Sequence, residues 1–439
     1  MFDAWKQRQR QRLENRPERT VFYNIFATMM LVLAVELLMA VASILAINVT
    51  EQLDENAKDL LTMRVRNRAS YVQEILRNAE DLEQLSEQIT ATTQQLLKSG
   101  DISLDTLDNS SEQSDALLVA LAPQLLDTLR TKQVTGIFLI LNTHDLDTCE
   151  VGKKMPGIYL RDMDPDARPS ERNSDLLLER ASATVVKELA IGTDKGWQPA
   201  FPYQGDTKGG ILRTVFQTAY KSDAGLSAES YGRWTTNSYC LAGDDRHAIA
   251  YSMPLILPDG TVYGVVGVEL LTDYLQTKLP FTELDEDKAG TYFIVTTTDG
   301  ALTDGVLSLR KTVTSGEDLI TADAPLGVLN CRSNGSGGNW VELNDKRYYM
   351  VLEPLQVYNR NAPFAAEKWF LAGTMEQSVL LAFSSRVREV LLTTIAITLV
   401  LSVLGSLLVS ARLARPINRL YREVIDAQEK KTFPRLSRT

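Results

Sequence analysis

The chain has 439 residues, of which 44% are apolar and 23% are charged, so it is long enough for two or three folded domains. The formal net charge is −10, with net basic ends and an acidic middle, which argues against a nucleic-acid partner. Three scattered cysteines (Cys149, Cys240, Cys331) argue against a disulfide framework or a zinc site and leave a single disulfide open. Two histidines, His144 and His247, supply almost no material for a Ser-His-Asp centre, and we expect no metal and no cofactor.

Residues 1–20 form a basic tail, and residues 21–49 (VFYNIFATMMLVLAVELLMAVASILAINV) form an apolar segment. This segment exceeds the roughly 20 helical residues that cross a bilayer core and is too long for a signal peptide. Glu36 lies near its middle, where a carboxylate is costly in lipid, so we expect it to face another helix or to be protonated. A surface position near a water defect is the alternative. We predict a first transmembrane helix here.

A long exposed helix is predicted next, because apolar residues recur at three- and four-residue steps from position 53 to position 96. Gly100 supplies a stop signal. The spacing is close to a heptad, so the helix can form the spine of a domain or a dimer seam. A second helix is predicted for residues 114–130.

The pattern then changes to strands, which we predict at residues 134–142, 157–164, 247–257 and 261–270. The turn Pro258-Asp259-Gly260 joins the last two into an antiparallel hairpin, and a short helix follows up to Pro280. A second, smaller series of strands is predicted at residues 290–300, 305–313, 339–355 and 367–375.

A helical pattern resumes at Glu376 and runs into residues 390–411, which carry no charge and form the stronger candidate for a membrane span. We assign residues 386–411 to this second transmembrane helix. Basic segments precede the first span and follow the second, so the positive-inside rule places both termini in the cytoplasm. Residues from about 50 to about 387 are then extracytoplasmic.

The hairpin AIAYSMPLILPDGTVYGVVGVELLTDYL, between two predicted spans, resembles the double Cache (dCache) sensor region of bacterial chemoreceptors, sensor kinases and diguanylate cyclases. The resemblance covers residues from about 50 to about 385. It implies an α+β fold in which a long N-terminal helix is followed by two PAS-like antiparallel-sheet modules, at residues 50–280 and 281–385, flanked by two transmembrane helices. It also implies a homodimer in the bacterial cell membrane.

Residues 412–439 begin with ARLARPINRLYREVIDAQ, which is similar to the first helix of a HAMP relay domain, including its proline. The second HAMP helix is missing, so we expect the chain to be part of a larger receptor. A short juxtamembrane helix is the alternative.

No motif of a nucleotide-binding loop, a nucleophile elbow, a zinc protease or a protein kinase is present, so we do not expect this chain to be an enzyme. The glycine cluster at 334–339 is interpreted as a loop. The acidic segments at 244–245 and 283–288 lack the alternation of a calcium loop and are interpreted as solvated turns. A catalytic domain beyond Thr439, of the diguanylate cyclase or histidine kinase type, is an alternative for the full-length protein.

The resemblance also implies a ligand site in the larger module. RTVFQTA at 213–219 resembles a degenerate form of the Arg-x-Trp-Tyr-x-x-Ala segment of amino-acid binders, and an arginine fork suits a ligand carboxylate. The family's aspartate two residues after its covering tyrosine is replaced here by Leu241, and the segment at 165–210 resembles an insertion. The residues implied as ligand-binding are Arg213, Phe216, Trp234, Tyr239, Asp244, Asp245 and Glu269.

Each of these residues also has a structural interpretation. Arg213 can be a surface ion-pair partner, and Trp234 and Tyr239 can be core aromatics. Glu269 follows an apolar run and should be buried, and a buried carboxylate needs a cationic or hydrogen-bonding partner. That partner is either internal, such as Lys278 or Arg213, or a ligand amine.

The sequence therefore predicts the input region of a transmembrane receptor that binds a small extracellular ligand and relays the signal through the second span and the HAMP-like helix. An amino acid, an amine, a carboxylate and a partner protein all remain open as ligands. An adhesion or scaffold ectodomain is the alternative from another class.

Overall fold

The computed structural model describes residues 23–38, 40–41, 49–109, 112–150, 152–167, 175–203, 211–222, 225–284, 290–303, 306–314, 326–329, 337–343 and 345–431. The chain divides into two compact units: Lys58–Leu380 is one, and Met1–Ala57 together with Leu381–Thr439 is the other. The predicted basic tail, Cys331, residues 334–336 of the glycine cluster, most of the acidic segment at 283–288 and the last residues of the HAMP-like segment lie outside the described residues. The interpretation of the glycine cluster as a loop was wrong for residues 337–339, which begin a strand.

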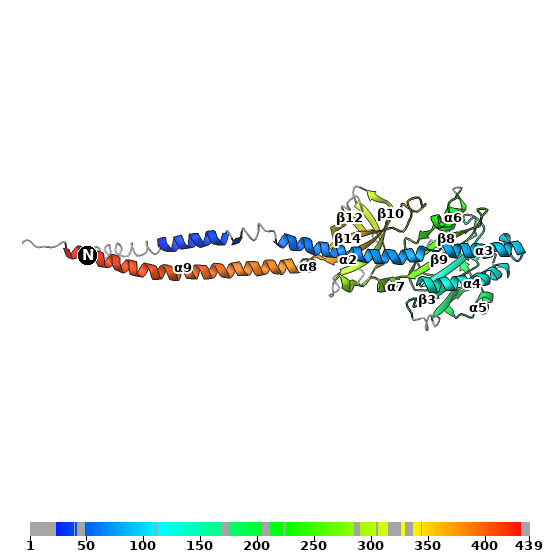
Figure 1. Ribbon diagram of the computed structural model, residues 1–439, viewed down its shortest axis with the longest axis horizontal. Coiled ribbons are helices and arrows are strands. Elements are labelled where there is room, and N and C mark those ends of the chain that lie inside the picture. Colours follow the sequence, from blue (N-terminus) through cyan, green and yellow to red (C-terminus); the bar gives the residue numbers. More distant parts are fainter. Residues whose placement is uncertain are drawn as a thin grey trace, which may run out of the picture. The chain divides into compact units, whose positions relative to one another are not determined.

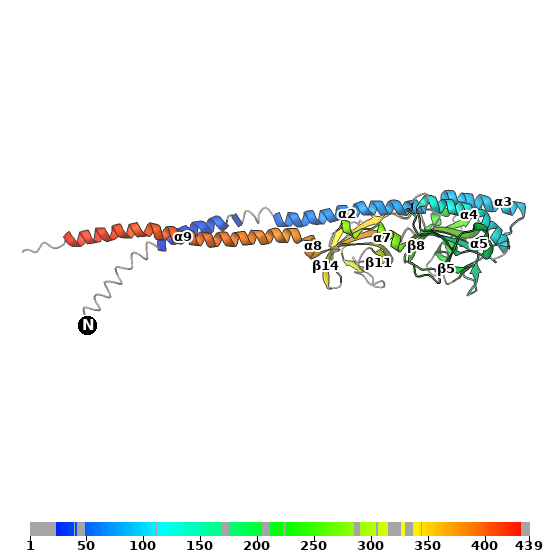
Figure 2. The same cartoon turned by 90° about the horizontal axis from the view of Figure 1, so that it is seen from below.

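Three helices form a layer along one side of the larger unit (Figures 1 and 2). They are α2 (Val49–Glu80), α3 (Glu83–Ser99) and α4 (Glu112–Lys132). The predicted second helix is confirmed by α4. The prediction of one unbroken helix up to Gly100 was wrong, because Asp81 and Leu82 are not helical although neither is proline or glycine. Asp81 there pairs with Lys132 of α4 at 2.6 Å. We infer that tertiary contacts, rather than local sequence, break the helix.

A seven-stranded sheet forms the larger module, in the order β5-β4-β3-β1-β9-β8-β7. The predicted hairpin is confirmed: β8 (Ala248–Ile256) and β9 (Val262–Leu271) pair antiparallel across a turn in which Gly260 has φ +89°. All neighbours are antiparallel except the edge pair of β4 and β5. The other strands are β1 (Gly136–Leu141), β3 (Gly157–Asp162), β4 (Leu176–Arg180), β5 (Thr193–Gln198) and β7 (Arg233–Trp234).

The two faces of this sheet have different neighbours, because successive side chains of a strand point to opposite faces. On β9, Leu270 lies beside residues of α2, whereas Val265 and Leu271 belong to an apolar cluster on the other face. That cluster includes Phe138, Tyr159 and the buried side of α6 (Arg213–Tyr220). The side chain of Glu269 therefore points toward the face that carries α6.

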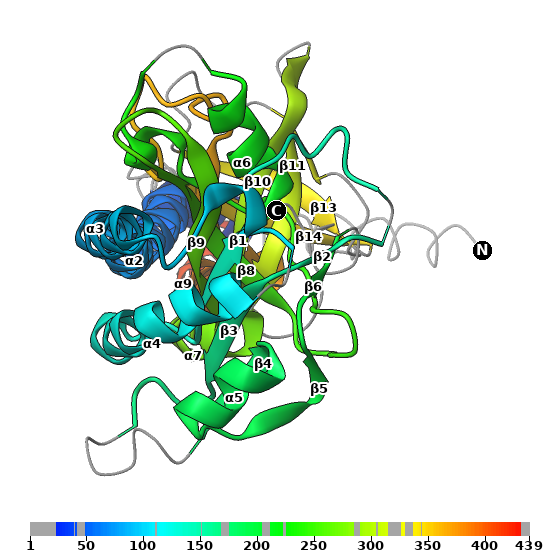
Figure 3. The ribbon, with the colours of Figure 1, turned by 90° about the vertical axis from the view of Figure 1, so that its right-hand side faces the viewer.

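The segment at 165–210 is not a loop insertion, as far as it is described. Residues 175–203 form β4, α5 (Ala183–Leu189), β5 and β6 (Phe201–Pro202), and β4 and β5 extend the main sheet (Figure 3). β6 pairs with β2 (Lys154–Met155) in a separate two-stranded sheet. These short elements belong to the frame of the module and supply two of its charged residues, as described below.

A six-stranded antiparallel sheet forms the smaller module, in the order β12-β11-β10-β15-β14-β13. Its strands are β10 (Gly290–Thr303), β11 (Val306–Thr314), β12 (Leu326–Leu329), β13 (Gly337–Leu343), β14 (Lys346–Leu355) and β15 (Trp369–Glu376). The short helix α7 (Thr272–Thr277) connects it to β9. The predicted fold class, a long helix with two antiparallel-sheet modules, is confirmed.

Trp234 lies at the junction of the two modules. Its ring centroid is 5.7 Å from that of Tyr251 on β8 and 6.2 Å from that of Trp369 on β15. Its indole Nε1 donates a hydrogen bond of 2.6 Å to the carboxylate of Glu80 at the end of α2, and its backbone N–H donates to Tyr358 Oη at 3.1 Å. The end of α2 and both sheets therefore meet at this indole.

The second unit of the chain, Met1–Ala57 with Leu381–Thr439, contains the helix α9 (Ala382–Lys431). In the chain, α9 follows β15 and the short helix α8 (Gln377–Leu380). Among the described residues, α9 is the one helix long and apolar enough to cross a membrane, over Ala382–Val424, and it contains the predicted second span. For the predicted first span, the structure describes a shorter apolar helix, Tyr23–Leu38. The two-pass topology and the domain boundaries stay predictions.

We expect Glu80 to make the stability of the larger unit depend on pH. Burial raises the pKa of Glu80 from 4.5 to about 7, although Trp234 and Arg77 act in the opposite direction and Glu229 adds to the rise. Because the pKa is raised in the folded state, the contribution of Glu80 to stability is fully present below pH 4.5 and is lost as the pH rises through about 7.

The variant Glu80→Gln keeps an acceptor for Trp234 and does not ionise. It should abolish this decrease and be more stable than the unmodified protein at pH 8 by about 2 kcal/mol, measured by urea unfolding at pH 5 and pH 8. The exposed Glu87 of α3, which does not contribute to the raised pKa of Glu80, provides the control variant Glu87→Gln. An identical pH profile in Glu80→Gln and the unmodified protein would contradict the expectation.

Candidate ligand site on the larger sheet

Glu269 lies near the end of β9 and is completely buried, as the sequence predicts. Its neighbours in the sheet are small: Gly136 of β1 lies on one side and Ala250 of β8 on the other. A Cβ at Gly136 would come within 2.9 Å of Glu269 Oε1. The glycine therefore makes room for a carboxylate that lies over the sheet and reaches across β1.

The partner of Glu269 is Arg161, on β3 at the far side of β1. Arg161 Nε donates to Glu269 Oε1 at 2.8 Å and Arg161 Nη2 donates to Oε2 at 2.9 Å, so the pair is bidentate. Both side chains are fully buried, and the field of Glu269 raises the pKa of Arg161 although burial acts to lower it. A charge-assisted pair of this geometry is among the strongest hydrogen-bonded contacts available to a protein.

Two tyrosines complete the shell around the Glu269 carboxylate. Tyr159 Oη donates to Glu269 Oε2 and lies 2.8 Å from Tyr239 Oη. Burial and then the nearby Glu269 charge raise the pKa of Tyr159 well above its usual value, so the phenol stays a hydrogen-bond donor. The Arg161 guanidinium carbon also lies 5.7 Å from the centroid of the Tyr159 ring.

A second layer of charges surrounds Arg161. Its Nη1 donates to Glu179 Oε1 at 2.8 Å and to Asp244 Oδ2 at 2.6 Å. Arg246 contacts the same two acids, with Nη2 at 2.8 Å from Glu179 Oε1 and Nε at 2.7 Å from Asp244 Oδ1. Arg246 also pairs with Asp194 of β5 at 2.6 Å.

The two acids of this layer respond in opposite ways to their surroundings. Burial raises the pKa of Glu179, and the arginines offset this only in part. Burial also acts to raise the pKa of Asp244, but hydrogen bonds from Arg246 and Arg161 outweigh it and the pKa is lowered. Glu179 Oε2 is buried and has no hydrogen-bond partner among the described residues. The layer therefore retains one unused buried acceptor.

The predicted site residues do not all come together. We call the charged residues described above, Arg161, Glu179, Asp194, Asp244, Arg246 and Glu269, the charge cluster. Asp244 belongs to it and Tyr239 contacts Glu269, whereas Asp245 is exposed. Phe216 packs in the apolar cluster on the same face of the sheet. Trp234 contacts Glu80 and Tyr251 on the opposite face, at the module junction.

The two internal partners that the sequence suggested for Glu269 lie elsewhere. Arg213 begins α6 with its side chain 53% exposed and pairs with Asp147, which agrees with its interpretation as a surface ion-pair partner. Lys278 pairs with Asp166. Sequence reasoning missed Arg161, although a charged residue in the strand pattern GIYLRDMD is the same kind of signal as Glu269. Cys149 and Cys240 are not in a disulfide.

No family model matches the chain, and no curated protein matches its sequence. Among solved structures, the chain is similar to the periplasmic sensory domain of the Campylobacter jejuni chemoreceptor Tlp1, at 12% identity and a TM-score of 0.42, over 75% of this chain and 98% of that chain. It is also similar to the ligand-binding domain of the Pseudomonas aeruginosa amino acid chemoreceptor PctC in complex with GABA, at 14% identity and a TM-score of 0.36, over 72% of this chain and 99% of that chain.

A third similar structure is the ligand-binding domain of the Pseudomonas fluorescens chemoreceptor CtaA in complex with L-isoleucine, at 13% identity and a TM-score of 0.36, over 76% of this chain and 96% of that chain. These structures are ligand-binding sensory domains, as is the family that the hairpin resembles. The similarity concerns the arrangement of helices and strands. The HAMP-like segment stays a prediction.

Removing Arg161 should strongly destabilise the larger unit. Arg161→Met leaves three buried or nearly buried carboxylates without their shared cation, which typically costs about 3–5 kcal/mol. Arg213→Met removes an exposed arginine from the same module and should cost at most about 1 kcal/mol. Urea unfolding of both variants at pH 7 tests this, and equal losses would contradict the role assigned to Arg161.

Proposed function

We propose that this chain is the input region of a transmembrane receptor, in which the unit Lys58–Leu380 binds a small polar ligand outside the cell. The observation that carries this proposal is the direct connection from the last strand of that unit to a membrane helix. β15 ends at Glu376, α8 occupies Gln377–Leu380, and α9 begins at Ala382. Between β15 of the smaller module and the helix that contains the predicted span, the chain has only the short helix α8 and Leu381.

The surface of α9 supports the membrane part of this proposal. Large apolar side chains on all sides of the helix are exposed, including Leu392 at 61%, Val400 at 56% and Leu408 at 69%. A helix that is apolar all round needs either a protein interior or lipid around it. Lipid suits a segment of this length, and the basic flanks place the following residues in the cytoplasm.

The ligand that best fits the charge cluster carries both an ammonium group and a carboxylate, as an amino acid does. Arg161 and Glu269 each offer a bidentate surface, and they now satisfy one another. A zwitterion inserted between them would give its ammonium to Glu269 and its carboxylate to Arg161, so neither charge is left unpaired. Tyr159 and Tyr239 would remain as hydroxyl partners on the Glu269 side.

Two features favour a cationic group on this ligand. The carboxylates of the cluster, Glu179, Asp194, Asp244 and Glu269, outnumber the guanidinium groups of Arg161 and Arg246. Glu179 Oε2 is a buried acceptor without a partner among the described residues, and a ligand N–H would satisfy it. A purely anionic ligand would add to the excess of negative charge.

The position of Glu269 gives such a ligand a route to the smaller module. Glu269 lies three residues before α7, which begins at Thr272 and leads to β10. Exchange of Arg161 for a ligand group would shift the end of β9 relative to β3 and thereby favour one of two arrangements of α7. Relay then proceeds through β15, α9 and the HAMP-like helix to an output domain, in a homodimer.

Binding can be tested with the full chain in lipid nanodiscs, screened by thermal shift and calorimetry against amino acids, amines and carboxylates. Asp244 and Asp245 provide a matched pair, since one lies in the cluster and the other is exposed. We expect Asp244→Asn to weaken binding of the stabilising amino acid at least tenfold, and Asp245→Asn to leave it within twofold.

Equal affinities in these two variants would place the ligand outside the cluster. Absence of stabilisation by every compound would contradict the sensory proposal and favour an adhesion or scaffold ectodomain.

The two-pass topology predicts which side of the membrane each unit occupies. In a variant without native cysteines, Ser227→Cys should react with a membrane-impermeant maleimide in intact bacterial cells, because Ser227 is exposed on the larger unit. Arg419→Cys, on the exposed surface of α9 beyond the span, should react only after the membrane is permeabilised. Labelling of both positions in intact cells would contradict the assigned topology.

A further inference from the structure

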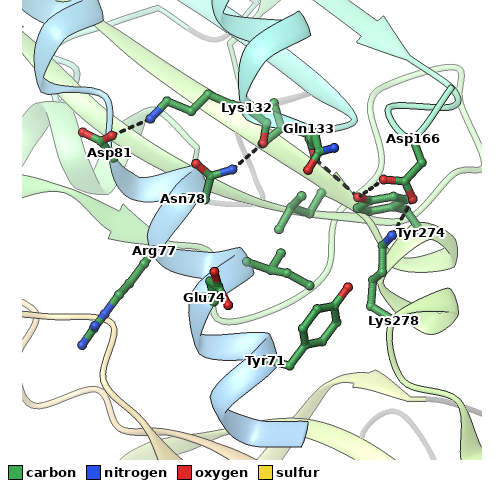
Figure 4. A pocket seen from close by; sticks show the side chains of 13 residues that line it. Tyr71, Glu74, Arg77, Asn78, Asp81, Lys132, Gln133, Asp166, Tyr274 and Lys278 are labelled. Carbon is green, nitrogen blue, oxygen red and sulfur yellow. Dashed lines mark hydrogen bonds and ion pairs between the residues drawn. The ribbon is translucent and has the colours of Figure 1, made fainter. Parts of the chain in front are cut away.

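A pocket of about 530 Å³ lies on the opposite face of the larger sheet from the charge cluster. Its volume falls within the range of roughly 300–1,000 Å³ that is usual for small-molecule sites. Figure 4 shows the residues that line it, which come from α2, the end of α4, β9, α7 and the segments that follow α2, α4, β3 and α7. They are Tyr71, Glu74, Ile75, Arg77, Asn78, Asp81, Lys132, Gln133, Val134, Asp166, Leu270, Tyr274 and Lys278.

The pocket has an apolar base and aromatic walls. Val134 and Leu270 are buried and Ile75 is half-buried. Tyr71 of α2 is 41% exposed, although a tyrosine ring is a large apolar surface. Tyr274 of α7 stands on the other side, with its hydroxyl 3.3 Å from Asp166. An apolar ligand body would therefore find both a base and a wall in this pocket.

Two lysines supply positive charge at opposite ends of the pocket. The side chains of Lys132 and Lys278 are only 19% and 18% exposed, whereas the acids that pair with them, Asp81 and Asp166, are 69% and 44% exposed. The lysines thus lie inside and the acids outside. An ammonium group has three N–H donors, so each lysine keeps donors beyond the one used by its acid.

We propose that this pocket is a second ligand site, and that it binds a small monocarboxylate with an apolar or aromatic body. The carboxylate pairs with Lys278, and the body packs against the half-buried Ile75 and the exposed ring of Tyr71. Glu74 of α2, at the wall of the pocket, has no ion pair among the described residues, so it disfavours a second anionic group on the ligand. The site is thus distinct from the charge cluster in face, residues and ligand class.

An occupant of this pocket would connect α2 to α7. The two helices are already joined about one turn before Tyr71 in α2. There Arg68 Nη1 donates to the backbone oxygen of Lys278, the residue that caps α7, at 3.0 Å. Arg68 also pairs with Glu283, and Arg64 Nη1 donates to the backbone oxygen of Leu284 at 2.9 Å. A ligand between Tyr71 and Tyr274 extends this contact by one further helical turn and fixes the connector between the two modules.

The test uses three probes with the same body and different charge: phenylacetate, phenylacetamide and 2-phenylethylamine. Binding to the full chain in nanodiscs is measured by calorimetry and by saturation-transfer NMR, with empty nanodiscs as the blank. We expect phenylacetate to bind at least tenfold more tightly than either other probe. Tighter binding of the amine, or no phenylacetate binding at millimolar concentration, would overturn the proposal.

Three variants locate the site. Lys278→Gln should weaken phenylacetate binding at least tenfold, whereas Lys221→Gln, which removes an exposed lysine of the same module, should leave it unchanged. Ile75→Phe fills the base of the pocket from a half-buried helix position and should abolish binding while the melting temperature stays close to that of the unmodified protein. Phenylacetate binding that survives both Ile75→Phe and Lys278→Gln would overturn the second site.

Discussion

The larger module depends on a single buried contact, the bidentate pair of Arg161 and Glu269, which connects β3 to β9 over the glycine of β1. A carboxylate at the end of an apolar strand is costly to bury, and a guanidinium group beside it is costly as well. The pair is tolerated because both charges are hydrogen-bonded: Tyr159 and Tyr239 lie on the carboxylate side, and two further acids accept from the guanidinium group. Removing Arg161 leaves Glu269 buried without its cation, so this pair holds β3, β1 and β9 together in one register.

The second constraint is the contact of both modules with the end of α2. Trp234 brings together Glu80 of α2, Tyr251 of the larger sheet and Trp369 of the smaller sheet. Earlier in α2, Gln73 exchanges two hydrogen bonds with the backbone of Gln356, the residue that follows β14. The helix is therefore attached to each module separately. A change in one module alters the other through α2 as well as through the connector α7.

Much of this fold follows from sequence pattern. The periodic apolar residues of α2, the hairpin of β8 and β9 and most strands of the smaller module were predicted from their spacing and turn residues, because these signals are local. In the smaller module β12 was not predicted, and the segment predicted at 339–355 is divided between β13 and β14. The break at Asp81 and Leu82 was not predicted, and Asp81 pairs there with Lys132, about 50 residues away in the chain. The parallel pairing of β4 with β5 was likewise invisible, because weak strand patterns do not specify their neighbours.

In the candidate site, too, local sequence predicts burial but not the contacts between residues far apart in the chain. The burial of Glu269 could be predicted from the six apolar or glycine residues before it, but its partner could not. Arg161 is two positions from Tyr159 on β3, so the two share a face, yet only the strand order places that face against Glu269. Arg213 was assigned to the ligand by a motif, but the residues around it form a surface helix and direct it to Asp147.

The two proposed ligand sites lie on opposite faces of β9. Glu269 and Leu270 are consecutive, so their side chains point to opposite faces, one into the charge cluster and the other into the base of the pocket beside α2. Both are followed within three residues by α7, the connector to the smaller module. A ligand at either proposed site would act on the same short segment, but by different means: exchange of an ion pair on one face would move the strand end, whereas filling the pocket on the other would fix α7 against α2. Occupancy of the pocket therefore should change the free energy of ion-pair exchange at Glu269, because one connector cannot adopt the two arrangements independently.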